Sequence, residues 1–304
     1  MGARDRRRRG RGTGRRTVTR ARDYLDLVRA PASLTVLGDA LVGALSARGP
    51  GADGPVRVGA LAVSSVCLYS AGMALNDWAD ADLDAIERPE RPIPSGRISR
   101  ERALAVGVGL TALGVGAAFA AGRAAGLVSI ALAGALWAYD TVFKTTAGGP
   151  LAMAACRWLD VMMGAAGPGW RSALGPAGAV AGHTLAVTAI SRGEVEGSTS
   201  TTGRAAVAGS VVVAASGLLG GGDRPAAVLG GARYLAAVLP GQVGVARRPG
   251  AVEARGATRA GIRAVVPLQS ALAARAGSPL ATAALLGIEA VGRVLGRRSR
   301  RDIT

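Results

Sequence analysis

The chain has 304 residues, of which 49% are hydrophobic and 3% aromatic, and its 37 basic and 20 acidic side chains give a formal net charge of +17. Such a charge suggests a nucleic-acid-binding protein, but so few aromatic side chains leave little for stacking on bases, and the mean hydropathy is positive at +0.30. We therefore expect no nucleic-acid partner. The hydrophobic fraction also excludes disorder for most of the chain, and it is typical of a polytopic membrane protein.

The N-terminus is strongly basic, because the first 22 residues hold ten arginines and no apolar stretch. We expect residues 1–22 to form a disordered cytoplasmic tail that attracts anionic lipid and orients the protein. A twin-arginine export signal fits less well, since the apolar segment that follows has no small-residue cleavage site. A second basic tail is expected at residues 298–304, which leaves residues 23–297 as the transmembrane domain.

Ten apolar segments rich in Ala, Gly, Val and Leu follow along the chain. Most have about 17–22 residues, enough at 1.5 Å per residue to cross a hydrocarbon core of about 30 Å. The sequence therefore predicts an all-α fold, a transmembrane bundle of nine to ten helices around a central cavity open to the cytoplasm. The segments are 27–48, 56–76, 103–122, 124–143, 149–168, 173–190, 205–222, 225–246, 258–275 and 278–296.

The positions of the basic residues distinguish this fold from an Ala-rich soluble helical protein. With a cytoplasmic N-terminus and ten crossings, 28 of the 37 Lys and Arg residues fall on the cytoplasmic side. This is the positive-inside pattern of membrane proteins, and a soluble protein has no reason to alternate its arginines in this way. We expect a multi-pass protein of the plasma membrane with a cytoplasmic N-terminus.

Acidic residues are concentrated in the region after the second segment, residues 76–97. At 100° per residue, Asp77, Asp80 and Asp84 fall on one helical face, whereas Asp82 points roughly the other way. Three converging carboxylates repel one another unless a cation lies between them, and hard oxygen ligands favour Mg²⁺. The alternative is a solvated loop in which acidic and basic side chains neutralise one another.

This region resembles the first aspartate-rich motif of the UbiA-type intramembrane prenyltransferases. The match lies after the second membrane segment and on the predicted cytoplasmic side, and the end of the fourth segment resembles the family's Tyr-x-x-x-x-Lys signature. The matching residues are Asn76, Asp77, Asp80, Asp84, Arg88 and Arg91-Pro92-Ile93-Pro94-Ser95-Gly96, with Tyr139 and Lys144 in the second signature.

The resemblance implies transfer of an isoprenyl group from a prenyl diphosphate to a lipophilic or aromatic small-molecule acceptor within the membrane. It implies Mg²⁺ as the cofactor, bound by the three aspartates and Glu194, which are then the catalytic residues. The cationic residues would neutralise the leaving diphosphate. The substrate-binding residues expected from the resemblance and from their position are Asn76, Arg88, Arg91, Tyr139, Lys144, Arg157 and Arg192.

The family's second aspartate motif is only partly present, in residues 191–198. Aligning Glu194 with the first aspartate places Ser198 where the last aspartate would be. Either Glu196 substitutes as a metal ligand, or a second ion is bound more loosely, or Arg192 takes over part of the charge neutralisation. This departure resembles the divergent, EboC-like branch of the family. It leaves a non-catalytic transporter or scaffold with the same fold as the alternative function.

Three ionisable residues lie inside predicted apolar helices, where charges usually face the bundle interior. Asp39 lies in the first segment, and Arg157 and Asp160 share one face of the fifth. We expect Arg157 to reach the diphosphate or to pair with Asp160. Asp39 or Asp160 is a candidate for orienting the acceptor or taking its proton.

Overall fold

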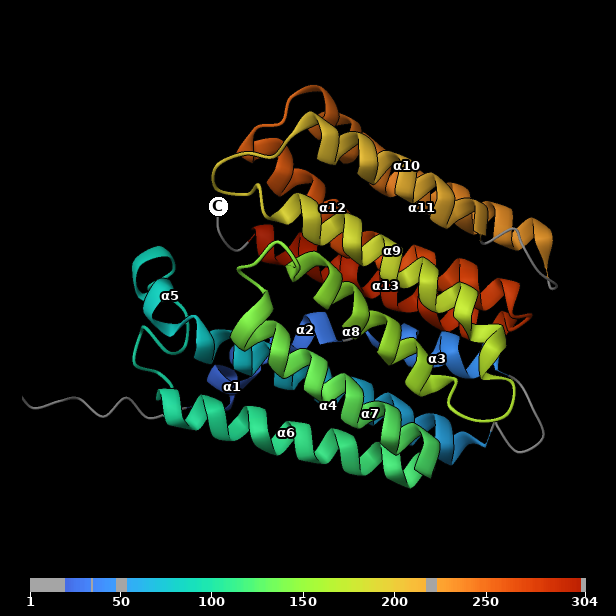
Figure 1. Ribbon diagram of the computed structural model, residues 1–304, viewed down its shortest axis with the longest axis horizontal. Helices are drawn as coiled ribbons and strands as arrows, with labels where there is room; N and C mark the ends of the chain where they lie inside the picture. The colour runs from blue at the N-terminus through green and yellow to red at the C-terminus, as the bar shows by residue number, and fades with distance from the viewer. Residues whose placement is uncertain (1–19, 34, 48–53, 217–222, 302–304) are drawn as a thin grey trace, which may run out of the picture.

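The computed structural model describes residues 20–33, 35–47, 54–216 and 223–301, and these residues form helices, turns and loops without a β-strand. Figure 1 shows the longer helices running roughly side by side along the longest axis of the molecule. The all-α prediction is confirmed. The predicted tails fall largely outside the described residues, but α1 already begins at Ala21 and α13 continues to Arg301, so both ends of the helical region extend beyond the predicted boundaries.

The first predicted segment, 27–48, is not one continuous helix. It is divided into α1 (Ala21–Leu27), α2 (Ala30–Ser33) and α3 (Leu37–Ser46). Between α1 and α2, Arg29 adopts a left-handed conformation with φ of +48°, which a regular right-handed helix does not contain. Pro31 follows and has no N–H to donate, so the hydrogen bonding of α1 cannot continue through it.

The next helices bring the aspartate-rich region to one end of the bundle. α4 (Pro55–Ala79) and α5 (Ala81–Glu87) meet at Asp80, which ends one helix and begins the other. α6 (Arg100–Ala121) then packs along α4, and the Ser99 hydroxyl caps its first turn by accepting a hydrogen bond from the Arg102 N–H. α5 extends from this end of the bundle in Figure 1.

The middle of the chain returns to the same end through a distorted helix terminus. α7 (Arg123–Ala138) continues into η1 (Tyr139–Phe143), a single π-helical turn, before α8 (Gly149–Gly164). A short 3₁₀ turn, η2 (Trp170–Ala173), leads into α9 (Leu174–Ser191). The wide π turn changes the direction of the side chains that follow it, and such turns are frequent at functional sites.

The C-terminal part consists of four long helices. They are α10 (Ser200–Ser216), α11 (Arg224–Arg247), α12 (Ala251–Arg275) and α13 (Pro279–Arg301). α12 packs on α3, α9, α11 and α13, so it joins the two parts of the bundle. Arg233 of α11 and Glu289 of α13 form an ion pair at 2.7 Å.

Four helical stretches among the described residues are long and apolar enough to cross a membrane. These are Pro55–Ala79, Arg100–Ala121, Arg123–Phe143 and Trp170–Ser191. Much of the surface of α6 and α7 is exposed and apolar, as expected for helices that face lipid. The remaining predicted crossings stay predictions.

Glycine allows α3 and α8 to approach each other closely. A Cβ atom on Gly43 would overlap with the carbonyl oxygen of Val161, and one on Gly164 would overlap with that of Ala40. Contacts of this kind between backbones are typical of helices packed inside a membrane, where dispersion forces replace the hydrophobic effect. The α3–α8 contact in turn places Asp39 beside α8.

We expect Gly43→Ala to lower the free energy of unfolding by about 2 kcal/mol, because a carbonyl oxygen occupies the space that the methyl group needs. Gly134→Ala is the matched control, since nothing lies within 4 Å of a Cβ atom at that position. The control should be neutral or stabilised by less than about 1 kcal/mol. Thermal unfolding in detergent measures both, and equal melting temperatures for the two variants would contradict the packing described.

Candidate functional site

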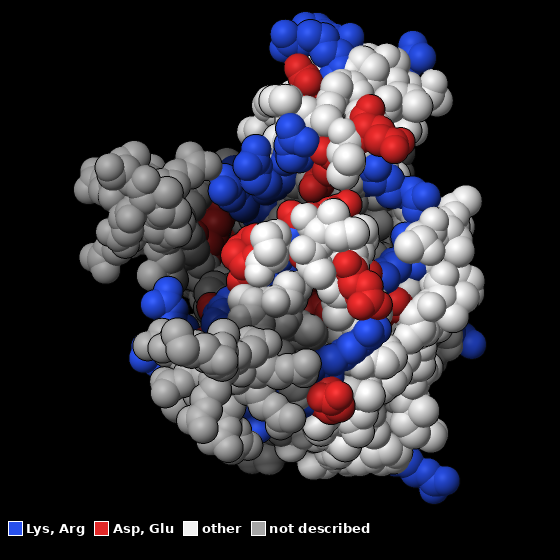
Figure 2. All heavy atoms as spheres, turned by 90° about the vertical axis from the view of Figure 1, so that its left-hand side faces the viewer, with Lys and Arg blue, Asp and Glu red and all other residues white. Residues whose placement is uncertain are grey.

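Charged side chains gather at the end of the bundle where α4 meets α5. Figure 2 looks at this end and shows blue and red side chains around a hollow in a largely white surface. The contributing segments are the end of α4, α5, the loop that precedes α6, η1 and the turn after α9. The aspartate-rich region and the Tyr-x-x-x-x-Lys signature therefore lie at the same end, as the sequence predicted.

Asp77 and Asp84 share one cation. Arg91 places one terminal guanidinium nitrogen 3.3 Å from Asp77 Oδ1 and 2.5 Å from Asp84 Oδ2. Both aspartates are only 3% exposed. Carboxylates that are buried to this extent are stable only when paired, so Arg91 provides the countercharge that allows the helix end to pack.

Asp80 has its own cation from the other side of the site. The ammonium group of Lys144 lies 2.6 Å from Asp80 Oδ1. Lys144 follows the π turn directly, and its backbone N–H donates to the carbonyl of Tyr139, the first residue of that turn. Nearby, the side-chain amide of Asn76 donates to Asp140 at 3.2 Å.

Asp82 lies outside this cluster. Its side chain is 89% exposed, and it pairs only loosely with Arg100 at 3.3 Å. The predicted division between one inward and one outward face is confirmed, although the chain changes helix at Asp80. Arg88 is exposed on the outer side of the loop.

Arg29 joins the site, although no role there was predicted for it. Its guanidinium donates to Asp77 at 3.0 Å and reaches Asn76 Oδ1 at 3.5 Å. The left-handed backbone at Arg29 breaks the first segment just where this side chain turns towards α4. The Pro31 that follows was the one signal in the sequence that predicts a break at this point.

The loop before α6 is fastened to the rest of the molecule by Arg97. Its guanidinium pairs with Asp23 at 2.9 Å and with Asp26 at 3.0 Å, both on α1. The Arg20 backbone N–H and then Arg97 donate to the Asp23 carboxylate and lower its pKa. The carboxylate is therefore charged at neutral pH, and the loop that carries Arg91 stays attached to α1.

The altered second motif makes different contacts from those expected. Arg192 donates to the carbonyl oxygens of Thr146 at 2.5 Å and Lys144 at 3.5 Å, so it supports the loop behind the Lys144 ammonium group. Glu194 is half-buried and accepts a hydrogen bond from Arg255 through its backbone carbonyl, while Glu196 is exposed. In the part of the chain that the structure describes, neither glutamate carboxylate forms an ion pair with a cation of the aspartate cluster.

Arg157 pairs with a different partner from the two that the sequence suggested. It forms a two-pronged ion pair with Asp39, with Nε 2.9 Å from Oδ2 and a terminal nitrogen 3.1 Å from Oδ1. Asp160 accepts instead from the Ser65 hydroxyl at 2.7 Å. Sequence spacing showed that Arg157 and Asp160 share a face, but it could not show that α3 approaches α8 closely enough to offer Asp39.

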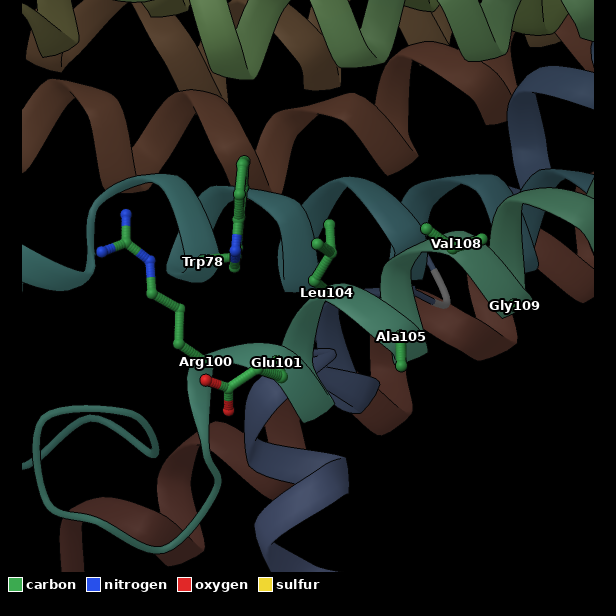
Figure 3. Close-up of a pocket in the computed structure, with 7 residues that line it drawn as sticks. All are labelled: Trp78, Arg100, Glu101, Leu104, Ala105, Val108 and Gly109. Atoms are coloured by element: carbon green, nitrogen blue, oxygen red, sulfur yellow. The ribbon is translucent and has the colours of Figure 1, made fainter.

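A separate pocket lies beside the aspartate cluster. It has a volume of about 640 Å³ and is lined by Trp78 of α4 and by the first turns of α6. Figure 3 shows Arg100 and Trp78 at one end of it, and the guanidinium lies 5.7 Å from the ring centre. Most of its α6 residues are exposed, so this pocket opens outwards and is distinct from the buried carboxylates.

The cluster offers carboxylate oxygens, which are the type of ligand that suits Mg²⁺. Among the described residues, no three Asp, Glu, His or Cys side chains stand arranged as a metal site. However, one nitrogen of Arg91 already contacts both Asp77 and Asp84, so these two carboxylates are close enough to share a cation. Carboxylate oxygen is the ligand that Mg²⁺ prefers. Asp77, Asp80 and Asp84 would hold the ion once their cationic side chains turn away.

The fold and the site thus define the class of protein. It is an all-helical membrane protein in which aspartates at one end of the bundle are paired with arginine and lysine side chains. Residues 36–239 match the model of the UbiA prenyltransferase family, and the chain belongs to that family. Members of the family are integral membrane proteins, in agreement with the four candidate spans.

Two groups of curated relatives are similar to parts of the chain. The digeranylgeranylglyceryl phosphate synthase of Ignicoccus hospitalis is 37% identical over 128 residues, which are 41% of this chain and 40% of the relative. The protoheme IX farnesyltransferase of Agrobacterium fabrum is 40% identical over 98 residues, 31% of this chain and 30% of the relative. The chain thus matches less than half the length of these relatives.

Solved structures share the fold over most of the chain. A UbiA homolog from Aeropyrum pernix K1 has a TM-score of 0.65 at 19% identity and covers 79% of this chain and 96% of its own. A UbiA homolog from Archaeoglobus fulgidus bound to DMAPP and Mg²⁺ has a TM-score of 0.59 at 14% identity, covering 82% of this chain and 99% of its own.

We expect Arg91→Ala to lower the free energy of unfolding by about 3 kcal/mol, because it leaves two buried carboxylates without their shared cation. Millimolar Mg²⁺ should restore part of this loss, since the ion fills the same place. Arg100→Ala removes the partner of an exposed aspartate and a guanidinium 5.7 Å from the Trp78 ring, both at the surface, and should change stability by less than about 1 kcal/mol. Thermal unfolding with and without Mg²⁺ measures all three effects, and an Arg91→Ala protein that does not respond to Mg²⁺ would contradict the metal assignment.

Proposed function

We propose that this protein transfers an isoprenyl group from a prenyl diphosphate to a lipophilic or aromatic acceptor within the membrane, in a reaction that requires Mg²⁺. The observation that carries the proposal is the cluster of Asp77, Asp80 and Asp84, each paired with a cation at one end of the bundle. Its match to the aspartate motif of a prenyltransferase family supports the same reaction.

The residues of the cluster take complementary roles in this proposal. Asp77, Asp80 and Asp84 hold Mg²⁺, which when bound draws negative charge from the diphosphate. Arg91 and Lys144 are freed from their carboxylates and donate to the phosphate oxygens, where guanidinium and ammonium groups bind well. Binding the diphosphate therefore replaces ion pairs within the protein by ion pairs with the substrate.

The transfer itself needs little covalent chemistry from the protein. The bond between the allylic carbon and the diphosphate oxygen breaks, and the electron pair leaves with the diphosphate. The acceptor then forms a bond to the allylic carbon and loses a proton. Cations held in a site from which water is excluded stabilise the charge that develops on the leaving group, and this accounts for the catalysis. Arg29, through its contact with Asp77, keeps that carboxylate oriented.

The second motif contributes less to metal binding in this proposal than in the family pattern. Glu194, together with Glu196, would add carboxylate ligands to those of the three aspartates, and Ser198 offers only a weak ligand. Arg192 compensates by fixing the carbonyl oxygens next to Lys144. These departures support assigning the chain to the divergent, EboC-like branch. Arg88, Asn76 and Tyr139 complete the substrate-binding set, and Asn76 already contacts both Asp140 and Arg29.

The topology proposed for the membrane follows the charge pattern. Nine to ten crossings within residues 23–297 surround a central cavity open to the cytoplasm, and the N-terminus is cytoplasmic. The basic tails then face anionic lipid of the plasma membrane. The positive-inside distribution supports this arrangement, and no nucleic acid is needed to explain the charge.

The alternative is a transporter or scaffold that kept the fold without the activity. Ser198 favours it, because serine is a weaker Mg²⁺ ligand than the aspartate of the family motif.

The two functions are separated by measuring Mg²⁺-dependent binding and consumption of geranyl, farnesyl and geranylgeranyl diphosphate by the purified protein in lipid. We expect consumption, and we expect Asp77→Ala and Asp80→Ala each to lower the rate by at least about 100-fold, because each removes a metal ligand. Asp82→Ala should be nearly silent, since its side chain is 89% exposed.

Absence of Mg²⁺-linked binding of all three diphosphates would favour the transporter or scaffold. If Asp82→Ala were the most damaging of the three substitutions, the assignment of the inward helical face would be wrong.

A further inference from the structure

A second polar cluster lies deep among apolar residues, away from the aspartates at the end of the bundle. Four helices contribute to it. Asp39 of α3 is fully buried, Asp160 of α8 is 6% exposed, and Gln269 of α12 is fully buried. Ser65 of α4 and Arg157 of α8 complete it. Charged groups at this depth are costly and are retained mainly where they line a functional interior.

Both oxygens of Asp39 have a partner within the cluster. Arg157 donates to Oδ1 at 3.1 Å and forms an ion pair with Oδ2 at 2.9 Å, and the Gln269 amide donates to Oδ1 at 2.7 Å. The same amide nitrogen also donates to the Thr35 carbonyl at 2.8 Å, so α12 is held against the broken first segment. Asp39 and Arg157 therefore neutralise each other.

Only one of the two carboxylate oxygens of Asp160 accepts a hydrogen bond within the cluster. Its Oδ2 accepts from Ser65, but its buried Oδ1 has no hydrogen-bond partner among the described residues. A hydrogen bond left unmade on a buried polar atom is unfavourable, so this oxygen is expected to accept a hydrogen bond from a bound ligand. Arg157, one turn away on the same helix face, uses Nε and one terminal nitrogen on Asp39, and no contact in the described chain engages its other terminal nitrogen.

The cluster lies below the proposed diphosphate site. Arg157 is eight residues into α8, whose first residue, Gly149, follows the Lys144 loop, so it lies about 12 Å deep. On α4, Ser65 precedes Asn76 by eleven residues, about three full turns, and the two therefore share a face. Half-buried Tyr69 lies between them on the same face.

We propose that Arg157 and Asp160 bind the end of the acceptor that is distant from the prenylated atom, and that this end is an uncharged hydroxyl group. The proposal rests on the proposed prenyl transfer and specifies its acceptor. A hydroxyl group donates to Asp160 Oδ1 and accepts from the remaining nitrogen of Arg157, so one group satisfies both. An acceptor that ends in a carboxylate or phosphate is rejected, because the cluster holds two carboxylates and a single guanidinium that is already paired.

The test compares two probes that differ only at that end, 4-hydroxybenzyl alcohol and 4-hydroxybenzoate. Calorimetric titration of the full chain in lipid nanodiscs should show the alcohol binding at least tenfold more tightly than the carboxylate. Asp160→Asn keeps the volume and removes the charge, so it should weaken binding of the alcohol, strengthen binding of the carboxylate and narrow the ratio by about tenfold. Ser64→Ala is the matched control. Ser64 is as buried as Ser65 but contacts Met163, and its substitution should leave both affinities unchanged.

The ratio of the two probe affinities in the wild-type protein tests the proposal even if Asp160→Asn fails to fold. Equal affinities, a preference for the carboxylate, binding of neither probe, or an unchanged ratio in Asp160→Asn would overturn it. Mg²⁺-dependent binding of geranylgeranyl diphosphate is measured on the same samples. If the alcohol is preferred but the diphosphate does not bind, prenyl transfer fails and the hydroxyl site stands. If the diphosphate binds and the alcohol is not preferred, prenyl transfer stands and the hydroxyl site fails.

Discussion

The need to neutralise buried carboxylates governs the functional end of this protein. Asp77 and Asp84 are almost completely removed from solvent, and a single guanidinium nitrogen of Arg91 contacts both. Without a countercharge these side chains would repel each other and pull the end of α4 away from α5. The loop that carries Arg91, its attachment to α1 through Arg97 and the pairing of Lys144 with Asp80 all maintain that neutrality. In the proposed function, the same arrangement prepares a site for a metal ion and an anion.

Irregular backbone conformations position two of the cationic side chains. The left-handed turn at Arg29 interrupts the first segment and directs its guanidinium to Asp77, while the π turn at the end of α7 presents Lys144 to Asp80. Regular helices elsewhere provide a rigid frame, with α3 and α8 pressed together at glycine. These two distortions lie at the charged end, where side chains must converge from several helices.

The sequence predicted the parts of this structure that depend on local spacing. The period of the helix placed Asp77, Asp80 and Asp84 on one face and Asp82 on the other, and hydrophobic segments located the helices. Contacts that depend on how helices distant in the sequence pack together could not be predicted from it. Arg157 pairs with Asp39 across 118 residues, and Arg192 donates to backbone carbonyls, which carry no signal in the sequence. Arg29 was missed because a break in an apolar segment is hard to recognise from composition alone.

In the proposed function, the aspartate cluster binds a divalent ion together with a diphosphate. Electron paramagnetic resonance with Mn²⁺ in place of Mg²⁺ tests it directly, because both ions take carboxylate and phosphate ligands and the Mn²⁺ spectrum records coupling to phosphorus. With geranylgeranyl diphosphate, the wild-type protein should bind Mn²⁺ with a resolved ³¹P coupling, and Asp77→Asn should lose that signal. Protein-bound Mn²⁺ without ³¹P coupling, or the same coupling in Asp77→Asn, would contradict the account.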